Sequence, residues 1–295
     1  MKQHFTKLLT LLAVASFSIT GAFAQLSGTY TIGSGTGYDY ASPAAAASAL
    51  VSSGVSGAVT FNIADGTYNG QVSLGSRISG ASSTNNITFQ SANGDSSKVI
   101  ITNSGTFTVY ASGSDYINFK DVTIQNTSSS THYNVYFTGG SNYYNFSNCR
   151  LISNTSGGFS YNVYNRGSEY VVFENSRILG GYYGFYNYGS GTGSSASEGN
   201  DVINCTIVKQ GYYGCYNRNQ REGEFSNNYV DSIVRNGYGL YNYYNNMMIV
   251  DANEFLNCYY GLYLRYENYV GSTSDTSIVT NNISKNNSYY GFYAY

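Results

Sequence analysis

Short stretches that alternate apolar and polar positions recur along most of this chain. One stretch consists of an aromatic residue, a small or polar residue, an apolar residue and a tyrosine, and it returns at a mean spacing of about 26 residues. The copies read FTVY, YNVY, YNVY, YGFY, YGCY, YGLY, YGLY and YGFY, and they end at Tyr110, Tyr136, Tyr164, Tyr186, Tyr216, Tyr241, Tyr263 and Tyr293. A repeat of this length predicts that each copy is one strand in a coil of a solenoid.

A second strand motif lies between the copies of the first. It reads YINFKDVTI from Tyr116, YYNFSNCRLI from Tyr143, YVVFENSRIL from Tyr170, NDVINCTIV from Asn200, GEFSNNYV from Gly223, MIVDANEF from Met248 and TSIVTNNI from Thr276. Asn, Gly and Ser turns join the two motifs, and no helical periodicity accompanies them. Two interleaved motifs on one period favour short strands wound into a solenoid over a β-sandwich.

The chain before the repeats is predicted to contain a targeting segment and a cap. Residues 1–24 resemble a cleaved signal peptide, because lysines precede a short apolar run and small residues precede Gln25. Residues 25–57 predict a first strand and a short helix that Ser42 caps, with Pro43 in its first turn and Gly54 just past its end. Residues 58–295 are then the coils, and the short helix covers the first of them.

Composition narrows the class of protein and its partners. The 34 glycines and 34 tyrosines with a single proline suit stacked parallel strands, because proline removes a ladder donor. Only 10% of the residues are charged and the formal net charge is −2, which argues against nucleic acid as a partner. After the signal peptide no apolar run approaches the roughly 20 residues that span a bilayer, so we expect no membrane insertion and a secreted or cell-surface location.

Two of the four cysteines, Cys149 and Cys205, are predicted to be unpaired. Cys149 and Cys205 occupy equivalent positions two coils apart, which at roughly 4.8 Å per strand separates them by about 10 Å, too far for a disulfide. Cys215 takes the central apolar position of its YGxY motif and is expected to be a small buried hydrophobe.

The cap helix, the segment VTFNIADGTY and the asparagines of the second motif resemble secreted right-handed parallel β-helix proteins of the pectin-lyase-like superfamily. The resemblance implies an all-β fold, a right-handed single-stranded parallel β-helix with a short N-terminal capping helix. It implies that the YGxY strand is the first strand of each coil, beside which polysaccharides lie in this superfamily. It also implies a turn ladder of Asp121, Asn148, Asn175, Asn204 and Asn227, from which Ala252 and Thr280 depart.

The catalytic signatures of that superfamily are not found in the sequence. The chain lacks tryptophan, its one proline lies in the cap, and neither the RxPxxR and WxDH elements nor the NTD, DD, GHG and RIK elements occur. Its carboxylates, such as Glu169, Glu198, Asp201, Glu222, Glu224, Glu254 and Glu267, are interpreted as dispersed among turns. We therefore assign no catalytic residue, metal ligand or cofactor from the sequence, although a carboxylate pair across coils stays possible.

The repeats predict a constant outer surface. Strand residues alternate between faces, so a core residue such as Phe185 places the following tyrosine outside, and the tyrosines form a ladder. The preceding glycine, for example Gly184, Gly214 or Gly239, is predicted to lie outside as an open floor beside the rings. Two residues past the core position come Asn165, Asn187, Asn217 and Asn242, expected to form a buried row of amides.

A further outward row alternates arginine and tyrosine, and it completes the candidate binding face. The residues assigned to this face are Tyr164, Arg166, Tyr186, Tyr188, Tyr216, Arg218, Tyr241, Tyr243, Tyr263 and Arg265. Tyrosines interposed between arginines give each guanidinium an aromatic neighbour, at about 0.5 to 1 kcal/mol per exposed contact. The row is thus explained either by stability alone or by binding of sugar rings and acidic groups.

The sequence favours an exported protein that binds or adheres to polysaccharide or a cell-surface glycan through this face. A polysaccharide lyase or glycoside hydrolase with a divergent site is one alternative, and a passive surface spacer is another. Two longer connections, one around residues 190–200 and one around 267–275, fall in the same turn and are expected to flank the face. The chain stops inside a repeat at Tyr295, which is compatible with a fragment and predicts self-association through an uncapped coil.

Overall fold

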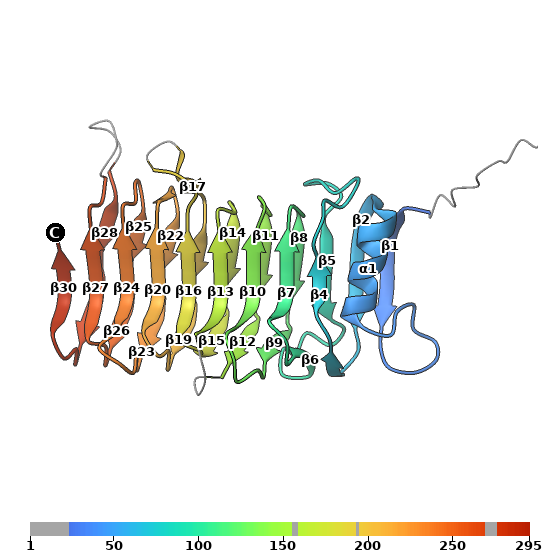
Figure 1. Cartoon of the computed structure of the whole chain (residues 1–295), viewed down its shortest axis with the longest axis horizontal. Coiled ribbons are helices and arrows are strands. Elements are labelled where there is room, and N and C mark those ends of the chain that lie inside the picture. The colour runs from blue at the N-terminus through green and yellow to red at the C-terminus, as the bar shows by residue number, and fades with distance from the viewer. Residues whose placement is uncertain (1–23, 155–158, 193–194, 269–275) are drawn as a thin grey trace, which may run out of the picture.

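The chain winds into a parallel β-solenoid, with its coils stacked along one long axis (Figure 1). The structure is a computed structural model and describes residues 24–154, 159–192, 195–268 and 276–295. Three sheets run the length of the solenoid, one with ten strands and two with nine. Each full coil gives one strand to each sheet, and the fold is the right-handed parallel β-helix that the sequence predicts.

Sheet A is the ten-stranded sheet. It consists of β1 (Leu26–Ile32), β2 (Val55–Ile63), β5 (Ile87–Ser91), β8 (Ile117–Lys120), β11 (Tyr144–Ser147), β14 (Val171–Glu174), β18 (Asp201–Ile203), β22 (Glu224–Ser226), β25 (Ile249–Asp251) and β28 (Ile278–Thr280).

Sheet B follows sheet A in each coil. It consists of β3 (Gly66–Asn69), β6 (Val99–Asn103), β9 (Thr123–Asn126), β12 (Arg150–Ser153), β15 (Arg177–Gly180), β19 (Thr206–Val208), β23 (Tyr229–Asp231), β26 (Glu254–Leu256) and β29 (Ile283–Lys285).

Sheet C contains β4 (Val72–Leu74) and, after it, the strands that carry the YGxY motif or its earlier variants. It consists of β4, β7 (Phe107–Ser112), β10 (His132–Thr138), β13 (Ser160–Arg166), β16 (Tyr183–Tyr188), β20 (Tyr213–Arg218), β24 (Tyr238–Tyr243), β27 (Tyr260–Arg265) and β30 (Tyr290–Ala294). A separate pair, β17 (Ser197–Glu198) and β21 (Gln220–Arg221), is parallel as well.

The N-terminal end is covered by the helix α1 (Pro43–Ser53), as the sequence predicts. The Ser42 side chain accepts a hydrogen bond from the backbone N–H of Ala45, and Gly54 ends the helix with a φ of 70°. The helix contacts β4, so it takes the place of a sheet C strand in the first turn. The segment 1–23, which holds nearly all of the expected signal peptide, lies outside the described residues. In the described part no helix has both the length and the apolar character needed to cross a membrane.

The core is a continuous column of apolar side chains between the three sheets. Phe61, Phe89, Phe119, Phe146 and Phe173 stack from coil to coil, with ring centres 4.4 to 5.2 Å apart. They are almost completely buried, and full burial of such a ring contributes about 1.5 to 3 kcal/mol. Identical residues at one repeat position therefore fix the register of neighbouring coils.

One residue in the left-handed conformation makes the sharp turn between sheets A and B. The expected ladder residues Asp121, Asn148, Asn175, Asn204 and Asn227 all have φ between 51 and 55°. Ala252 takes the same conformation with a φ of 53°, so this departure is confirmed. The assignment of Thr280 is wrong, because Thr280 ends β28 and Asn281, with a φ of 54°, makes the turn.

The residue after the turn points into the core and forms a polar row of its own. The Cys205 N–H donates to Asn228 Oδ1 (2.8 Å), and the Asn228 N–H donates to Asn253 Oδ1 (2.9 Å). Cys149 lies in this row, because its N–H donates to Ser176 Oγ (3.0 Å). Cys149 and Cys205 are buried free thiols two coils apart, and Cys215 and Cys258 are buried and free as well. The prediction of unpaired cysteines is confirmed.

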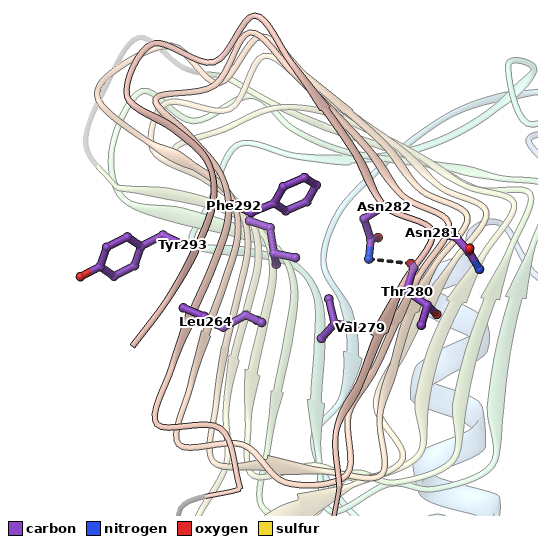
Figure 2. Close-up of a pocket in the computed structure, with 9 residues that line it drawn as sticks. Leu264, Val279, Thr280, Asn281, Asn282, Phe292 and Tyr293 are labelled. Carbon is purple, nitrogen blue, oxygen red and sulfur yellow. Dashed lines mark hydrogen bonds between the residues drawn. The ribbon is translucent and has the colours of Figure 1, made fainter.

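The C-terminal coil leaves the interior open in this chain. Leu264, Val279 and Phe292 point into the space between the sheets, whereas the Tyr293 ring points outward (Figure 2). The space has a volume of about 470 Å³. Phe292 is 51% exposed although its partner on the preceding strand, Leu262, is buried.

Candidate functional site

The outer face of sheet C carries the tyrosine ladder that the sequence predicts. Tyr186, Tyr216 and Tyr241 are partners in register on adjacent strands, and their rings stack at 4.8 and 5.4 Å between centres. The ladder, here called the second column, is Tyr110, Tyr136, Tyr164, Tyr186, Tyr216, Tyr241, Tyr263 and Tyr293. Most of its rings are half-buried by their neighbours, and Tyr216 is only 9% exposed.

A first column of aromatic rings, which the sequence analysis missed, runs beside the second. It is formed by the residue that opens each motif: Phe107, Tyr133, Tyr161, Tyr183, Tyr213, Tyr238, Tyr260 and Tyr290. The two columns meet edge to face, as between Tyr183 and Tyr186, whose ring centres are 5.3 Å apart at 73°. Such pairs contribute about 0.5 to 1.5 kcal/mol each, so the face is rigid.

The two columns are possible because the strands of sheet C break the alternation of faces. Tyr183 pairs with Tyr213 and Phe185 with Cys215, but the glycines between them are not paired in the ladder. Gly184 and Phe185 both face inward, which returns Tyr186 to the outside. The expectation of an outward glycine floor is therefore wrong. A Cβ on Gly184 would overlap the Gly214 carbonyl oxygen and lie 3.2 Å from the core atom Ile207 Cγ2.

The row of amides two residues past the core position is buried, as predicted. Asn187 Nδ2 donates to Asn217 Oδ1 (2.8 Å), and Asn217 Nδ2 donates to Asn242 Oδ1 (3.1 Å). Asn165, the first of the row, bonds instead within its own turn, to the backbone of Ser168. The amides hold the C-terminal ends of these strands in register under the tyrosine face.

The alternating row of arginine and tyrosine lies in register at the edge of the same face. Arg166 pairs with Tyr188, Tyr188 with Arg218, Arg218 with Tyr243, and Tyr243 with Arg265. The Arg218 guanidinium lies between two rings, 5.0 Å from the centre of Tyr188 and 5.2 Å from that of Tyr243. Arg265 lies over Tyr243 (5.5 Å), and its other ring is Tyr266 (5.0 Å), the next residue along the chain.

These arginines have no acidic partner in the described part of the chain. The ion pairs found there join Arg221 to Glu198 and Glu222, and Lys285 to Glu254. Burial raises the pKa of the Tyr186 and Tyr241 phenols, so these groups stay neutral donors and acceptors at physiological pH. The row thus brings positive charge, aromatic rings and hydroxyl groups together.

Both longer connections run from sheet C to sheet A, as predicted, and start beside this row. The connection after β16 contains β17, and Glu198 in β17 accepts a hydrogen bond from the Tyr170 hydroxyl (2.8 Å) and pairs with Arg221. Residues 193–194 and 269–275 of the two connections lie outside the described residues.

The carboxylates are not all dispersed, and this corrects the sequence interpretation. Asp201 and Glu224 lie on adjacent strands of sheet A, where the Glu224 N–H donates to Asp201 Oδ1 (2.8 Å). With Glu222 they line a pocket of about 380 Å³. Burial raises the pKa of Asp201 to about 6, and the charge of Glu224 adds to this effect. Within the described segments, no three His, Cys, Asp or Glu side chains are arranged to hold a metal ion.

The fold and its repeated turns define a parallel β-helix protein, and a family model supports this class directly. Residues 133–295 match the family described as the right handed beta helix region. The match covers more than half of the chain, so the chain belongs to that family. No curated protein sequence matches the chain.

Three solved structures resemble the whole architecture. The pectate lyase Pel9A is 13% identical over 86% of this chain and 73% of its own, with a TM-score of 0.57. A rhamnogalacturonan lyase is 14% identical over 81% and 70%, with a TM-score of 0.56. The pectin methylesterase from Aspergillus niger is 16% identical over 75% and 86%, with a TM-score of 0.51. At identities this low, the structural similarity establishes a shared fold and nothing further.

Proposed function

We propose that this protein binds acidic polysaccharide or cell-surface glycan through the outer face of sheet C. The face comprises Tyr164, Arg166, Tyr186, Tyr188, Tyr216, Arg218, Tyr241, Tyr243, Tyr263 and Arg265. The single observation that carries the proposal is Arg218, whose two faces are covered by Tyr188 and Tyr243 while no described carboxylate pairs with it. Its Nε atom is buried, so its terminal Nη groups would donate to an external carboxylate or sulfate.

The geometry of the face supports an extended ligand. The columns repeat one ring per coil, at the roughly 4.8 Å spacing of paired strands. Because the rings of each column stack face to face, the half-buried tyrosines present ring edges and hydroxyl groups to the oxygens of a polysaccharide. Three solved proteins that share the fold are named for pectin or rhamnogalacturonan, which supports a polysaccharide ligand without identifying it. The expected export of the chain would place this face in contact with such polymers.

The experiment removes the charge of the row without emptying the core. We expect the triple variant Arg166→Gln, Arg218→Gln and Arg265→Gln to bind an acidic polysaccharide such as polygalacturonate at least tenfold more weakly, because each site loses a charge-assisted hydrogen bond. Binding of the parent should also weaken as the salt concentration rises from about 0.05 to about 0.5 M. The reason is that the Debye length is about 10 Å at 0.1 M and shortens as salt is added, which screens the exposed charges.

A matched control separates the row from total charge. The triple variant Arg77→Gln, Lys98→Gln and Lys120→Gln removes three exposed cations that precede the row in the N-terminal coils, and it should bind as the parent does. Equal loss in both variants would mean nonspecific attraction, and no loss in the first variant would assign the row to stability alone. The second result would favour the passive spacer.

The pair Asp201 and Glu224 favours one second candidate, a glycoside hydrolase with a divergent site. A carboxyl with a raised pKa beside a second carboxyl is the arrangement of an acid and a base or nucleophile. The test is reducing-sugar release from acidic and neutral polysaccharides by the parent and by Glu224→Gln. Release that Glu224→Gln abolishes would support catalysis, and absence of release from every polymer would leave binding as the function.

A further inference from the structure

A second concave site lies where sheet B passes into sheet C, at the edge of the face opposite the arginine row. It has a volume of about 720 Å³, which falls in the usual range for small-ligand pockets. Its chemistry is set by Ile152, Leu179, Tyr182, Lys209, Val234 and Arg235. None of these residues belongs to the candidate binding face described above.

The floor of this pocket is apolar, although it lies on the outside of the solenoid. Ile152 on β12 and Leu179 on β15 are partners in register, and both are half-buried outward residues. Val234 is 63% exposed at the rim. Exposed aliphatic side chains gathered beside polar groups are typical of a surface that a ligand covers.

The Tyr182 ring forms one wall of the pocket, and backbone hydrogen bonds and ring packing hold it in place. Its backbone N–H donates to both the carbonyl (2.8 Å) and the hydroxyl (2.9 Å) of Ser160, and its ring packs edge to face on Tyr183 at 4.8 Å. Gly211 lies against the ring, and a Cβ there would come 3.0 Å from Tyr182 Cδ2. The missing side chain at Gly211 therefore keeps this part of the pocket open.

Two cations border the apolar floor, and neither forms an ion pair with a described carboxylate. Lys209 and Arg235 are exposed, and the Arg235 guanidinium lies 5.6 Å from the centre of the Tyr182 ring. Neither cation takes part in an ion pair of the described residues, and no acidic side chain lines the pocket. Asp231, close in sequence, accepts side-chain hydrogen bonds from Asn257 (2.7 Å), Ser232 (3.0 Å) and Tyr229 (3.3 Å) instead.

We propose that this pocket binds a six-membered ring that carries a carboxylate. The carboxylate would lie between Lys209 and Arg235, and the face of the ring would cover Ile152 and Leu179 beside the Tyr182 ring. A neutral ring leaves two cations without a partner, and a small inorganic anion leaves the apolar floor uncovered, so neither satisfies the whole site. A uronic acid and an aryl carboxylate share the required chemistry.

The test is a ligand-observed NMR titration of residues 25–295 with glucuronate, benzoate and glucose. We expect glucuronate or benzoate to bind more tightly than glucose, and which of the two binds identifies the source of the ring. In Lys209→Gln with Arg235→Gln, affinity for the anionic ring should fall at least tenfold. The variants Arg77→Gln with Lys120→Gln, and the triple variant of the arginine row, should bind as the parent does.

A second variant tests the pocket without removing either cation. Val234→Asp places a negative charge on the exposed rim, where it empties no core volume, and it should weaken the same ligand by a similar factor. Circular dichroism confirms that each variant is folded. The proposal is overturned if neither anionic ring binds, if glucose binds as tightly, or if the cation variant keeps the parent affinity. Because the arginine row is not part of this pocket, failure here leaves the proposed function untouched, and the reverse also holds.

Discussion

The guanidinium of Arg218 lies 5.0 Å from the centre of the Tyr188 ring, one coil away on the adjacent strand. Tyr243 covers its other side at 5.2 Å, so the cation is enclosed by two rings that belong to the solenoid itself. Without the interposed tyrosines, arginines on adjacent strands would repel each other at about 5 Å. The alternation therefore lets the coil stack carry a line of positive charge, and no carboxylate of the described residues pairs with it.

The inward glycines of sheet C should not tolerate a side chain. A Cβ on Gly214 would overlap the carbonyl oxygen of Gly239 and lie 2.9 Å from Val230 Cγ1. We expect Gly214→Ala to lower the free energy of unfolding by about 1 to 3 kcal/mol, the usual cost of overpacking. The control Gly75→Ala, where the nearest atom is 3.4 Å away, should change it by less than about 0.5 kcal/mol. Thermal melts of both variants measure the difference, and equal melts would contradict the inward orientation.

The fold could be predicted from the sequence because equivalent residues of successive repeats pair with one another when the coils stack. Identical residues such as Tyr186 and Tyr216 must meet when coils stack, so their contact needed no tertiary information. The orientation of Gly184 was missed because strict alternation assigns it to the outside, and the unpaired residue that shifts the alternation has no sequence signal of its own. For the same reason the first column was not predicted, although its member Tyr183 opens the YGFY motif.

The acidic pair and the second pocket were missed for a different reason. Asp201 and Glu224 face each other only after connections of unequal length bring their strands together, so their spacing in sequence gave no indication. Lys209 and Arg235 occupy different positions of the repeat, and the pocket forms because Gly211 leaves room beside Tyr182. Features that recur in every repeat could be predicted from the sequence. Features that depend on one residue departing from the repeat could not.

The four thiols should be unreactive in the folded protein. Burial raises the pKa of Cys149, Cys205 and Cys258 to about 12, and it raises the pKa of Cys215 as well. Since the thiolate is the reactive form, iodoacetamide at pH 8 should label none of them before unfolding and all four in denaturant. Mass spectrometry of the non-reduced chain reads the result. A disulfide between Cys149 and Cys205 would contradict the finding that they occupy equivalent positions two coils apart.

Protonation of Asp201 should stabilise the fold. Its pKa rises from 3.8 to about 6 on folding, so the folded state binds the proton more tightly and loses stability as the pH rises through this window. We expect Asp201→Asn to raise stability at pH 7.5 by about 1 kcal/mol, after allowance for partial solvent screening, and to have little effect at pH 3.5. Asp251→Asn is the control, because hydrogen bonds from Thr280 and Asn281 lower the pKa of Asp251. A stability gain at pH 7.5 in Asp251→Asn but not in Asp201→Asn would contradict the raised pKa of Asp201.

In a protein made of residues 25–295, the exposed end of the last coil should pair with a second copy. Val279 and Phe292 are 40% and 51% exposed at the end of the core, and β28, β29 and β30 each leave one edge unpaired in the described sheets (Figure 2). Parallel strands with free edges and an apolar end pair readily with another chain. Sedimentation velocity on residues 25–295 should show association that grows with concentration and that Val279→Lys with Phe292→Lys suppresses. A monomer at every concentration would contradict the expectation.

The most direct measurement of the central claim is NMR of the arginine side chains during titration with an acidic oligosaccharide. The account predicts that the Nε–Hε signals of Arg166, Arg218 and Arg265 shift on addition of oligogalacturonate, while that of Arg77 stays in place. A neutral oligosaccharide of equal length should leave all of these signals unchanged. Shifts confined to arginines outside the row, or no shift at saturating ligand, would contradict glycan binding by the tyrosine and arginine face.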